Sequence, residues 1–494
     1  MLDWSRSNSE LAIGLYEELR KTNVELPLLV VDWSEGGEPV REQYARTDQR
    51  IRVLTEADLG DPNAVAAALE SVGVPLPLAR VQVDPGAGGL VLEGLLRWLG
   101  PENLQLIIQK FFPDAIHAQV EPVGGGWSDA KLLRVLVRGE PAPYFLKFFT
   151  DGDAYRREWE RHERARAWLA EAAVPLRHVP NLGGGAPNQL QAFPPMEPCV
   201  FPVCYESAST KDRPHETLKD FYRTAQKTNL ERAIRRLADI LSKDQPLEPA
   251  EQDPDEPPWA DSGEDCFRLT PTTKERLLNT LDDLSLYGAG IFASDFEVRW
   301  RELEGFLYMP LPRWLVDWRP VLRGHVHGDP NPRNCLVSKD DPKDLVLIDC
   351  GAYRPNGRLV SDLAIVERDI KLLMMGLEHD ARDFFDLDVG QLRDWCQAER
   401  TAIRAGLKYT SPPVAAAGGR YASAPRAYRL VGIVRREAKR VCGTWDREGN
   451  HYFAALLFRT LEILEYPAVR RAKKLLALYS ASEILQAFRS PASP

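Results

Sequence analysis

Residues 326–351, VHGDPNPRNCLVSKDDPKDLVLIDCG, constrain the fold of this chain more than any other segment. Their composition predicts an exposed turn that holds His327, Gly328 and Asp329, with Asn334 five residues after the aspartate. Two short strands, CLV and LVLID, follow and are joined by a polar turn, and the second is expected to end on Asp349. The sequence therefore predicts a polar loop followed directly by a β-hairpin.

These polar residues are the parts that phosphoryl transfer requires. One carboxylate must orient the acceptor hydroxyl and take its proton, while an amide oxygen and a second carboxylate hold magnesium against the phosphates. Magnesium prefers such hard oxygen ligands. Asp329 and Asn334 have the Asp-x4-Asn spacing of a kinase catalytic loop, and Asp349 stands where the metal-binding aspartate belongs. We therefore expect ATP and magnesium as cofactors, with a hydroxyl-bearing acceptor that the sequence does not identify.

The same segment resembles two enzyme families. HGDPNPRN followed by LIDCG is similar to the HGD-x4-N and ID-x-G pair of aminoglycoside phosphotransferases and choline kinases. The resemblance implies that Asp329 is the catalytic base and that Asn334 and Asp349 are magnesium ligands. It implies that His327 braces the loop. Pro330 departs from the usual apolar residue, and its fixed φ predicts a stiffer loop.

A closer resemblance is to the ternary complex associated domain, a kinase-like module of bacterial multidomain and conflict-system proteins. Asp362, Leu363, Ala364 and Glu367 match its D-[FL]-A-x-x-E pattern, and the similarity covers roughly residues 117–490. It implies an α+β, two-lobed protein-kinase-like fold with a helical C-terminal extension. It also leaves open an alternative to the enzyme, a catalytically silent nucleotide-binding regulatory or scaffold module.

A glycine cluster lies ahead of this core, between two apolar segments that predict strands. Gly125, Gly126 and Ser128 resemble the G-G-x-S-G-A pattern of the nucleotide-binding turn. Backbone N–H groups of such a turn can approach phosphates closely because no side chain intervenes. Asp129 replaces the later glycine, and its carboxylate is expected to point outward. A plain hairpin turn is the alternative interpretation.

Lys147 follows in an apolar and aromatic strand, where an unpaired ammonium would be costly. The kinase role is contact with the nucleotide phosphates and an ion pair with a helix glutamate, whereas an edge-strand lysine would face water. In the helix predicted over residues 153–172, Glu158 shares the inward face with His162 and Leu169 at helical spacing. Glu158 is therefore the preferred partner, and Glu163 suits the longer spacing of the aminoglycoside enzymes.

Outside this core, the sequence predicts helices over residues 9–22 and 62–71 and strands starting at Leu26 and at Arg50. This alternation predicts a small α/β domain over residues 1–90. It loosely resembles part of a bacterial receiver domain, with Asp32 at a strand end, and it offers a surface for a protein partner. The remaining predicted parts are linker helices over 91–116, a kinase-like N-lobe over 117–206 and a C-lobe over 207–494. An acidic, proline-rich loop or disordered insert is expected at 246–264.

Composition limits which partners the protein is expected to bind and where in the cell it is expected to be. A net charge of -9 argues against a general nucleic-acid binder, because binding the nucleic-acid backbone needs a basic face. The seven cysteines have no metal-ligand spacing, and an odd number does not suit a disulfide framework. No membrane association is expected, since the strongest apolar run, residues 26–31, is too short to cross a bilayer. These features predict a cytoplasmic protein with reduced thiols.

Overall fold

The computed structural model describes part of the chain. The described residues are 2–3, 28–32, 51–55, 82–85, 98–112, 115–123, 131–140, 142–169, 172, 176–177, 201–209, 214–243, 271–308, 323–375, 389–410, 423–443, 449–466, 469 and 471–489. The chain divides into two compact units, residues 1–85 with 100–119 and residues 86–99 with 120–494.

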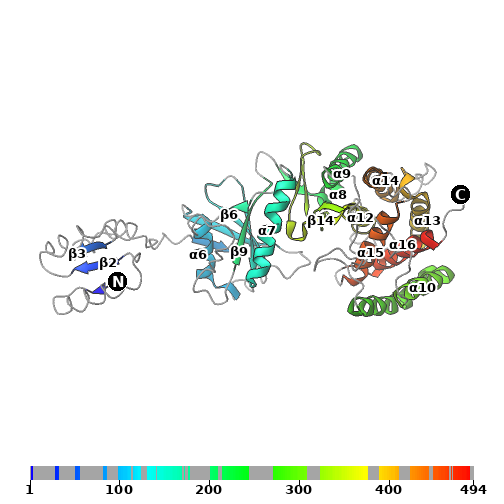
Figure 1. Ribbon diagram of the computed structural model, residues 1–494, viewed down its shortest axis with the longest axis horizontal. Helices are drawn as coiled ribbons and strands as arrows, with labels where there is room; N and C mark the ends of the chain where they lie inside the picture. Colours follow the sequence, from blue (N-terminus) through cyan, green and yellow to red (C-terminus); the bar gives the residue numbers. More distant parts are fainter. Residues whose placement is uncertain are drawn as a thin grey trace. The chain divides into compact units, whose positions relative to one another are not determined.

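The first unit holds a three-stranded parallel sheet in the order β1-β2-β3 (Figure 1). The bounds are β1 Leu2–Asp3, β2 Leu28–Asp32 and β3 Ile51–Thr55, followed by β4 (Gln82–Pro85) and helix α6 (Pro101–Phe111). The strands predicted after Leu26 and Arg50 are confirmed. The helices predicted over 9–22 and 62–71 lie outside the described residues.

An antiparallel sheet begins the second unit. Its neighbouring strands are, in order, β5 (His117–Pro122), β6 (Lys131–Val137), β7 (Tyr144–Phe149), β9 (Phe201–Glu206) and β8 (Leu176–Arg177). Helix α7 (Gly152–Leu169) packs beside them (Figure 1). Residues alternate between buried and half-buried along β7, so Tyr144, Leu146 and Phe148 face the interior and Lys147 faces the opposite side.

The next strands and helices lie over residues 215–358 and include the predicted loop and hairpin. They are β10 (His215–Thr217), α8 (Leu218–Thr224), α9 (Lys227–Leu241), α10 (Pro271–Tyr308), β11 (Arg323–Val326), β12 (Cys335–Ser338), β13 (Leu345–Leu347) and β14 (Arg354–Arg358). Apolar residues of α9 recur at three- and four-residue spacing from Leu230 to Leu241 and are buried, which leaves its charged face outward. β12 pairs antiparallel with β13, with Cys335 opposite Leu347.

The described residues from Leu359 onward are almost all helical, as predicted. It contains α12 (Leu359–Asp369), a π-helical turn (Ile370–Met374), α13 (Val389–Ala405), α14 (Ser423–Cys442), α15 (Asn450–Glu465) and α16 (Arg471–Arg489). α12 packs on α14 and α15, and every residue of α12 is buried, so it is the central helix of this region (Figure 1). Among the described residues, no helix has the length and apolarity to cross a bilayer.

A network of buried charges fixes the central helix. Glu367 of α12 binds Arg435 of α14 through two hydrogen bonds of 2.6 and 2.8 Å and accepts a third from the Tyr452 hydroxyl at 2.6 Å. Lys371 lies 3.0 Å from Glu367 and 2.9 Å from Glu399 of α13. Since buried charges are tolerated only when paired, this network ties α12, α13, α14 and α15 to one arrangement.

Candidate active site

Three segments distant in sequence meet at the ammonium of Lys147. Its Nζ lies 2.8 Å from Oε1 of Glu158 on α7 and 2.9 Å from Oδ1 of Asp349. Burial alone would lower the pKa of Lys147, but the neighbouring carboxylates of Asp349 and Glu158 outweigh it and raise the pKa above its ordinary value. Lys147 is therefore held as a cation at the junction of the sheet, α7 and the segment after β13.

Glu158 is buried on the inner face of α7, together with His162, Ala165 and Leu169. Besides Lys147, Glu158 accepts a 2.6 Å hydrogen bond from the hydroxyl of Tyr205 in β9. Glu163 does not make this ion pair. One of its carboxylate oxygens is buried without a hydrogen-bond partner in the part of the chain that the structure describes. The structure therefore pairs Lys147 with Glu158.

Helix α7 also contacts the segment that carries Asp349. Arg161 donates a 2.7 Å hydrogen bond to the carbonyl of Gly351, and a Cβ at Gly351 would lie 2.2 Å from Oε2 of Glu158. Any side chain at Gly351 would therefore displace the glutamate from the lysine.

The loop from His327 to Asp329 is held in place by Asp362 of α12. The backbone N–H groups of His327 and Gly328 donate to the two oxygens of Asp362 at 2.6 and 2.9 Å. Gly328 has a φ of 86°, and a Cβ there would lie 2.2 Å from the carbonyl oxygen of Ala352. Only glycine combines this left-handed backbone with so close an approach.

His327 is fully buried and braces the loop from inside. Burial lowers the pKa of His327 to about 4, so the imidazole is neutral at physiological pH. Its Nε2 lies 3.1 Å from the carbonyl oxygen of Ile348, which can only accept, so Nε2 carries the proton. The histidine thus ties the loop to the residue that precedes Asp349.

Asp329 is oriented by two asparagines. Asn331 Nδ2 and Asn334 Nδ2 donate to Oδ2 of Asp329 at 2.9 and 3.1 Å, while Oδ1 has no partner among the described residues. Asn334 Nδ2 also donates to the Asp329 carbonyl at 3.0 Å. Burial raises the pKa of Asp329 to about 7, and Arg368 opposes the shift. The arrangement leaves one carboxylate oxygen open beside a fixed loop.

Asp349 differs from the sequence prediction in its backbone. β13 ends at Leu347, two residues earlier than expected, and Asp349 lies beyond it with φ 59° and ψ 57°. A residue in this left-handed conformation cannot continue a strand. Among the described residues it is the one non-glycine position with positive φ. Backbone strain of this kind persists where surrounding contacts hold the residue in place. At Asp349 one such contact is the ion pair with Lys147.

The donor set near this point suits magnesium. The Asp349 side chain is 48% exposed, and its Oδ2 has no partner within the described ranges. The amide nitrogen of Asn334 is used by Asp329, which leaves the amide oxygen as its available donor. A carboxylate oxygen and an amide oxygen are hard ligands of the type that magnesium takes, with water and phosphate completing its shell. The residues present therefore fit the ion.

Some contacts were not found from the sequence, and some predicted residues have no described position. The contacts of Asn331, Tyr205 and Arg161 were not predicted, although the short spacing of Asn331 from Asp329 was a signal for its contact. Gly125, Gly126 and Ser128 lie outside the described residues.

The sheet with α7, the loop and hairpin, and the helical C-terminal region form a kinase-like fold of mixed helices and strands. A family model described as the phosphotransferase enzyme family matches residues 119–370, just over half of the chain. The chain belongs to this phosphotransferase enzyme family. A search of the curated proteins found no match.

Several solved structures are similar to this chain. Aminoglycoside phosphotransferase APH(4)-Ia is 13% identical with a TM-score of 0.37, covering 79% of this chain and 99% of its own. Plasmodium vivax ethanolamine kinase is 10% identical with a TM-score of 0.29, and the match covers 76% of this chain and 84% of the kinase. Choline kinase LicA from Streptococcus pneumoniae is 15% identical with a TM-score of 0.26, and the match covers 69% of this chain and 92% of LicA.

Proposed function

We propose that this protein is an ATP- and magnesium-dependent phosphotransferase that transfers the γ-phosphoryl group to a hydroxyl acceptor. The observation that carries the proposal is Lys147, bound at once to Glu158 at 2.8 Å and Asp349 at 2.9 Å. An ammonium fixed between these two carboxylates is the arrangement by which kinases contact the nucleotide phosphates beside the metal. Membership of the phosphotransferase family supports the same reaction.

Asp329 is the proposed catalytic base. Both asparagine amides donate to Oδ2, so Oδ1 is free to accept the proton of the acceptor hydroxyl. As that proton moves to Asp329, the acceptor oxygen bonds to the γ-phosphorus and the bond from that phosphorus to the ADP oxygen breaks. His327 and Asp362 do not touch the reactants in this proposal. They position the loop.

Asn334 and Asp349 would hold magnesium, which neutralises charge on the phosphates when bound. Lys147 orients the phosphates, and Glu158 holds Lys147 in place. Gly125, Gly126 and Ser128 remain the predicted backbone and hydroxyl contacts to the nucleotide. The ternary complex associated subtype also remains a prediction, as do the separate N-terminal domain over residues 1–90 and its protein partner.

The alternative is a module that binds nucleotide without transferring phosphate. The open Oδ1 of Asp329 favours the enzyme, because a binding module has no use for a positioned base. A loop held by Asp362, His327 and two asparagines also costs conformational entropy that binding alone does not require.

Thermal unfolding of the full-length protein with and without Mg-ATP tests nucleotide binding. Nucleotide at 100 times its dissociation constant should stabilise the folded state by about 2.7 kcal/mol. Incubation with γ-labelled ATP and a cell extract then tests transfer, with Asp349→Ala as the control that should lose both signals. No thermal shift at millimolar nucleotide would contradict the proposal. A shift without transfer or hydrolysis would favour the binding module.

A further inference from the structure

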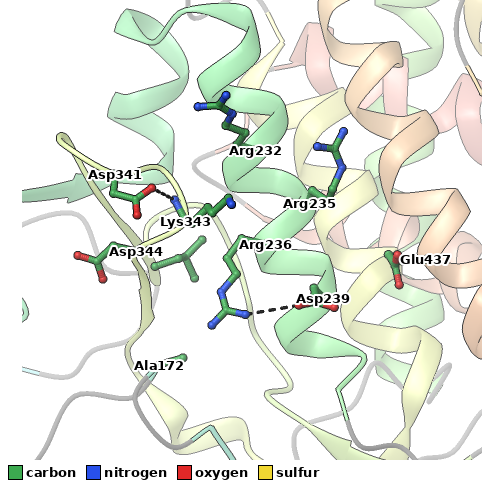
Figure 2. Close-up of a pocket in the computed structure, with 10 residues that line it drawn as sticks. Ala172, Arg232, Arg235, Arg236, Asp239, Asp341, Lys343, Asp344 and Glu437 are labelled. Atoms are coloured by element: carbon green, nitrogen blue, oxygen red, sulfur yellow. Dashed lines mark hydrogen bonds and ion pairs between the residues drawn. The ribbon is translucent and has the colours of Figure 1, made fainter.

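A cavity of about 750 Å³ lies away from the candidate active site, between α9 and the turn that joins β12 to β13 (Figure 2). Arg232, Arg235 and Arg236 line it from α9, and Lys343 lines it from the turn. None of the described residues of the candidate active site lines this cavity. Among the described residues, its apolar lining is limited to Ala172 and Leu345, so it does not suit a hydrophobic ligand.

The acidic side chains that line the cavity are already engaged within the protein. Each carboxylate has a basic or N–H partner within the protein. The pairs are Asp239 with Arg236 at 3.4 Å, Asp341 with the backbone N–H of Lys343 at 3.0 Å, Asp344 with His215 at 3.2 Å and Glu437 with Arg440 at 2.6 Å.

Three cations of the lining have no such partner. Within the described ranges, the side chains of Arg232, Arg235 and Lys343 make no hydrogen bond or ion pair. Arg232 and Arg236 stand four residues apart on one exposed face of α9, with Arg235 beside them. Like charges at this spacing destabilise a helix. A bound anion would offset that repulsion.

Lys343 is held opposite the helix by a rigid turn. The N–H of Asp344 donates to the carbonyl of Asp341 at 2.9 Å, and the N–H of Lys343 donates to the Asp341 side chain at 3.0 Å. Pro342 occupies the first central position, where its fixed φ favours this turn. Figure 2 shows the Lys343 side chain extending toward α9. Cations therefore approach the cavity from two walls.

We propose that this cavity binds a compact polyanion carrying at least two phosphate groups, at a site separate from the candidate active site. Guanidinium groups match phosphate oxygens through paired hydrogen bonds, and the lysine adds a point charge. Three cations on two walls of the cavity, without a partner in the described ranges, suit a compact ligand. An extended acidic peptide would instead need cations in a row along an open groove.

Calorimetric titration of the full-length protein with inositol hexakisphosphate at low salt tests this inference. We expect one binding site per chain, weakened as ionic strength rises. The double variant R232Q/R235Q should lose about tenfold or more in affinity, because two charge-assisted contacts are removed. The matched control K227Q/R404Q removes the same charge from exposed positions outside the cavity and should bind like the wild type.

Two further measurements complete the experiment. The first shows whether the polyphosphate binds in this cavity or at the candidate active site, and the second shows whether the ligand is a polyphosphate or an acidic peptide. Lys147→Ala, which alters the candidate active site, should leave the titration unchanged, and a peptide of aspartate and glutamate should show no saturable binding. Binding lost in Lys147→Ala but kept in R232Q/R235Q would overturn the proposal in favour of the active site. Equal loss in both double variants, no saturable binding of the polyphosphate, or binding of the peptide alone would also overturn it. Thermal unfolding of each variant confirms that it is folded.

Discussion

Lys147 Nζ lies 2.9 Å from Asp349 Oδ1, although 202 positions separate the two residues in the chain. The same ammonium lies 2.8 Å from Glu158, so a strand, a helix and a loop meet at one nitrogen atom. A lysine held by two carboxylates on separate elements fixes those elements relative to each other. Each partner should therefore affect nucleotide binding even where it does not touch the nucleotide.

Glu158→Gln should weaken Mg-ATP binding by about tenfold, because the neutral amide no longer holds the charged lysine in place. Isothermal titration of wild type and variant measures the change. Glu163→Gln is the matched control on the same helix, and it should bind like the wild type because Glu163 does not contact Lys147. Equal affinity losses in the two variants would contradict the assigned pairing.

Much of this site could be predicted from residue order, because the parts of the loop and hairpin are close in sequence. The contact between Asp329 and Asn334 follows from local spacing, and the face of α7 that carries Glu158 follows from helical periodicity. The left-handed conformation of Asp349 was not predicted. It depends on an ion pair with a residue 202 positions away, and no local pattern contains that information.

The long-range contacts of the central helix were also beyond local reasoning. A match to a pattern singled out Asp362 and Glu367, but the pattern did not show what they bind. Asp362 accepts hydrogen bonds from the backbone N–H groups of His327 and Gly328, and Glu367 lies in a buried charge network with Arg435. The packing of helices sets such partners, and Glu367 and Arg435 are 68 positions apart, so spacing within one segment does not encode their contact.

Gly328→Ala should lower the rate of phosphoryl transfer by about 10²-fold, because displacement of the loop by about 1 Å moves the base from its productive position. A Cβ at this residue would lie 2.2 Å from the Ala352 carbonyl oxygen. Gly139→Ala is the control, since Gly139 also has positive φ but no described residue has an atom within 4 Å of the added carbon. A rate in Gly328→Ala equal to that of the control would show that the loop tolerates the displacement.

Glu367→Gln should destabilise the folded state by about 3–5 kcal/mol, because the buried charge of Arg435 loses its partner. Urea unfolding followed by tryptophan fluorescence measures the difference. Glu160→Gln provides the comparison: it removes an exposed pair with Arg164 at 3.9 Å and should cost less than about 1 kcal/mol. A similar cost for both variants would mean that the buried network does not stabilise the central helix.

The stability that Glu367 contributes should depend on pH in a defined direction. Burial acts to raise its pKa, but Arg435 and Lys371 outweigh burial and lower the pKa to about 2. The contribution is therefore present above the unfolded-state pKa of about 4.3 and is lost as the pH falls toward 2. Urea unfolding between pH 6 and pH 3, with Glu367→Gln as reference, should show the difference between the proteins shrinking. A difference that stays constant or grows toward low pH would contradict the assignment.

The most direct test of the proposed mechanism is ATP turnover by Asp329→Asn, because slow hydrolysis needs no identified acceptor. The amide preserves the shape of the side chain and removes the proton acceptor, so Mg-ATP should still bind while turnover falls by about 10²–10⁴-fold. Asp349→Ala, in contrast, should lose Mg-ATP binding as well. Turnover that survives Asp329→Asn unchanged, with nucleotide binding intact, would show that Asp329 is not the base and that the proposed mechanism is wrong.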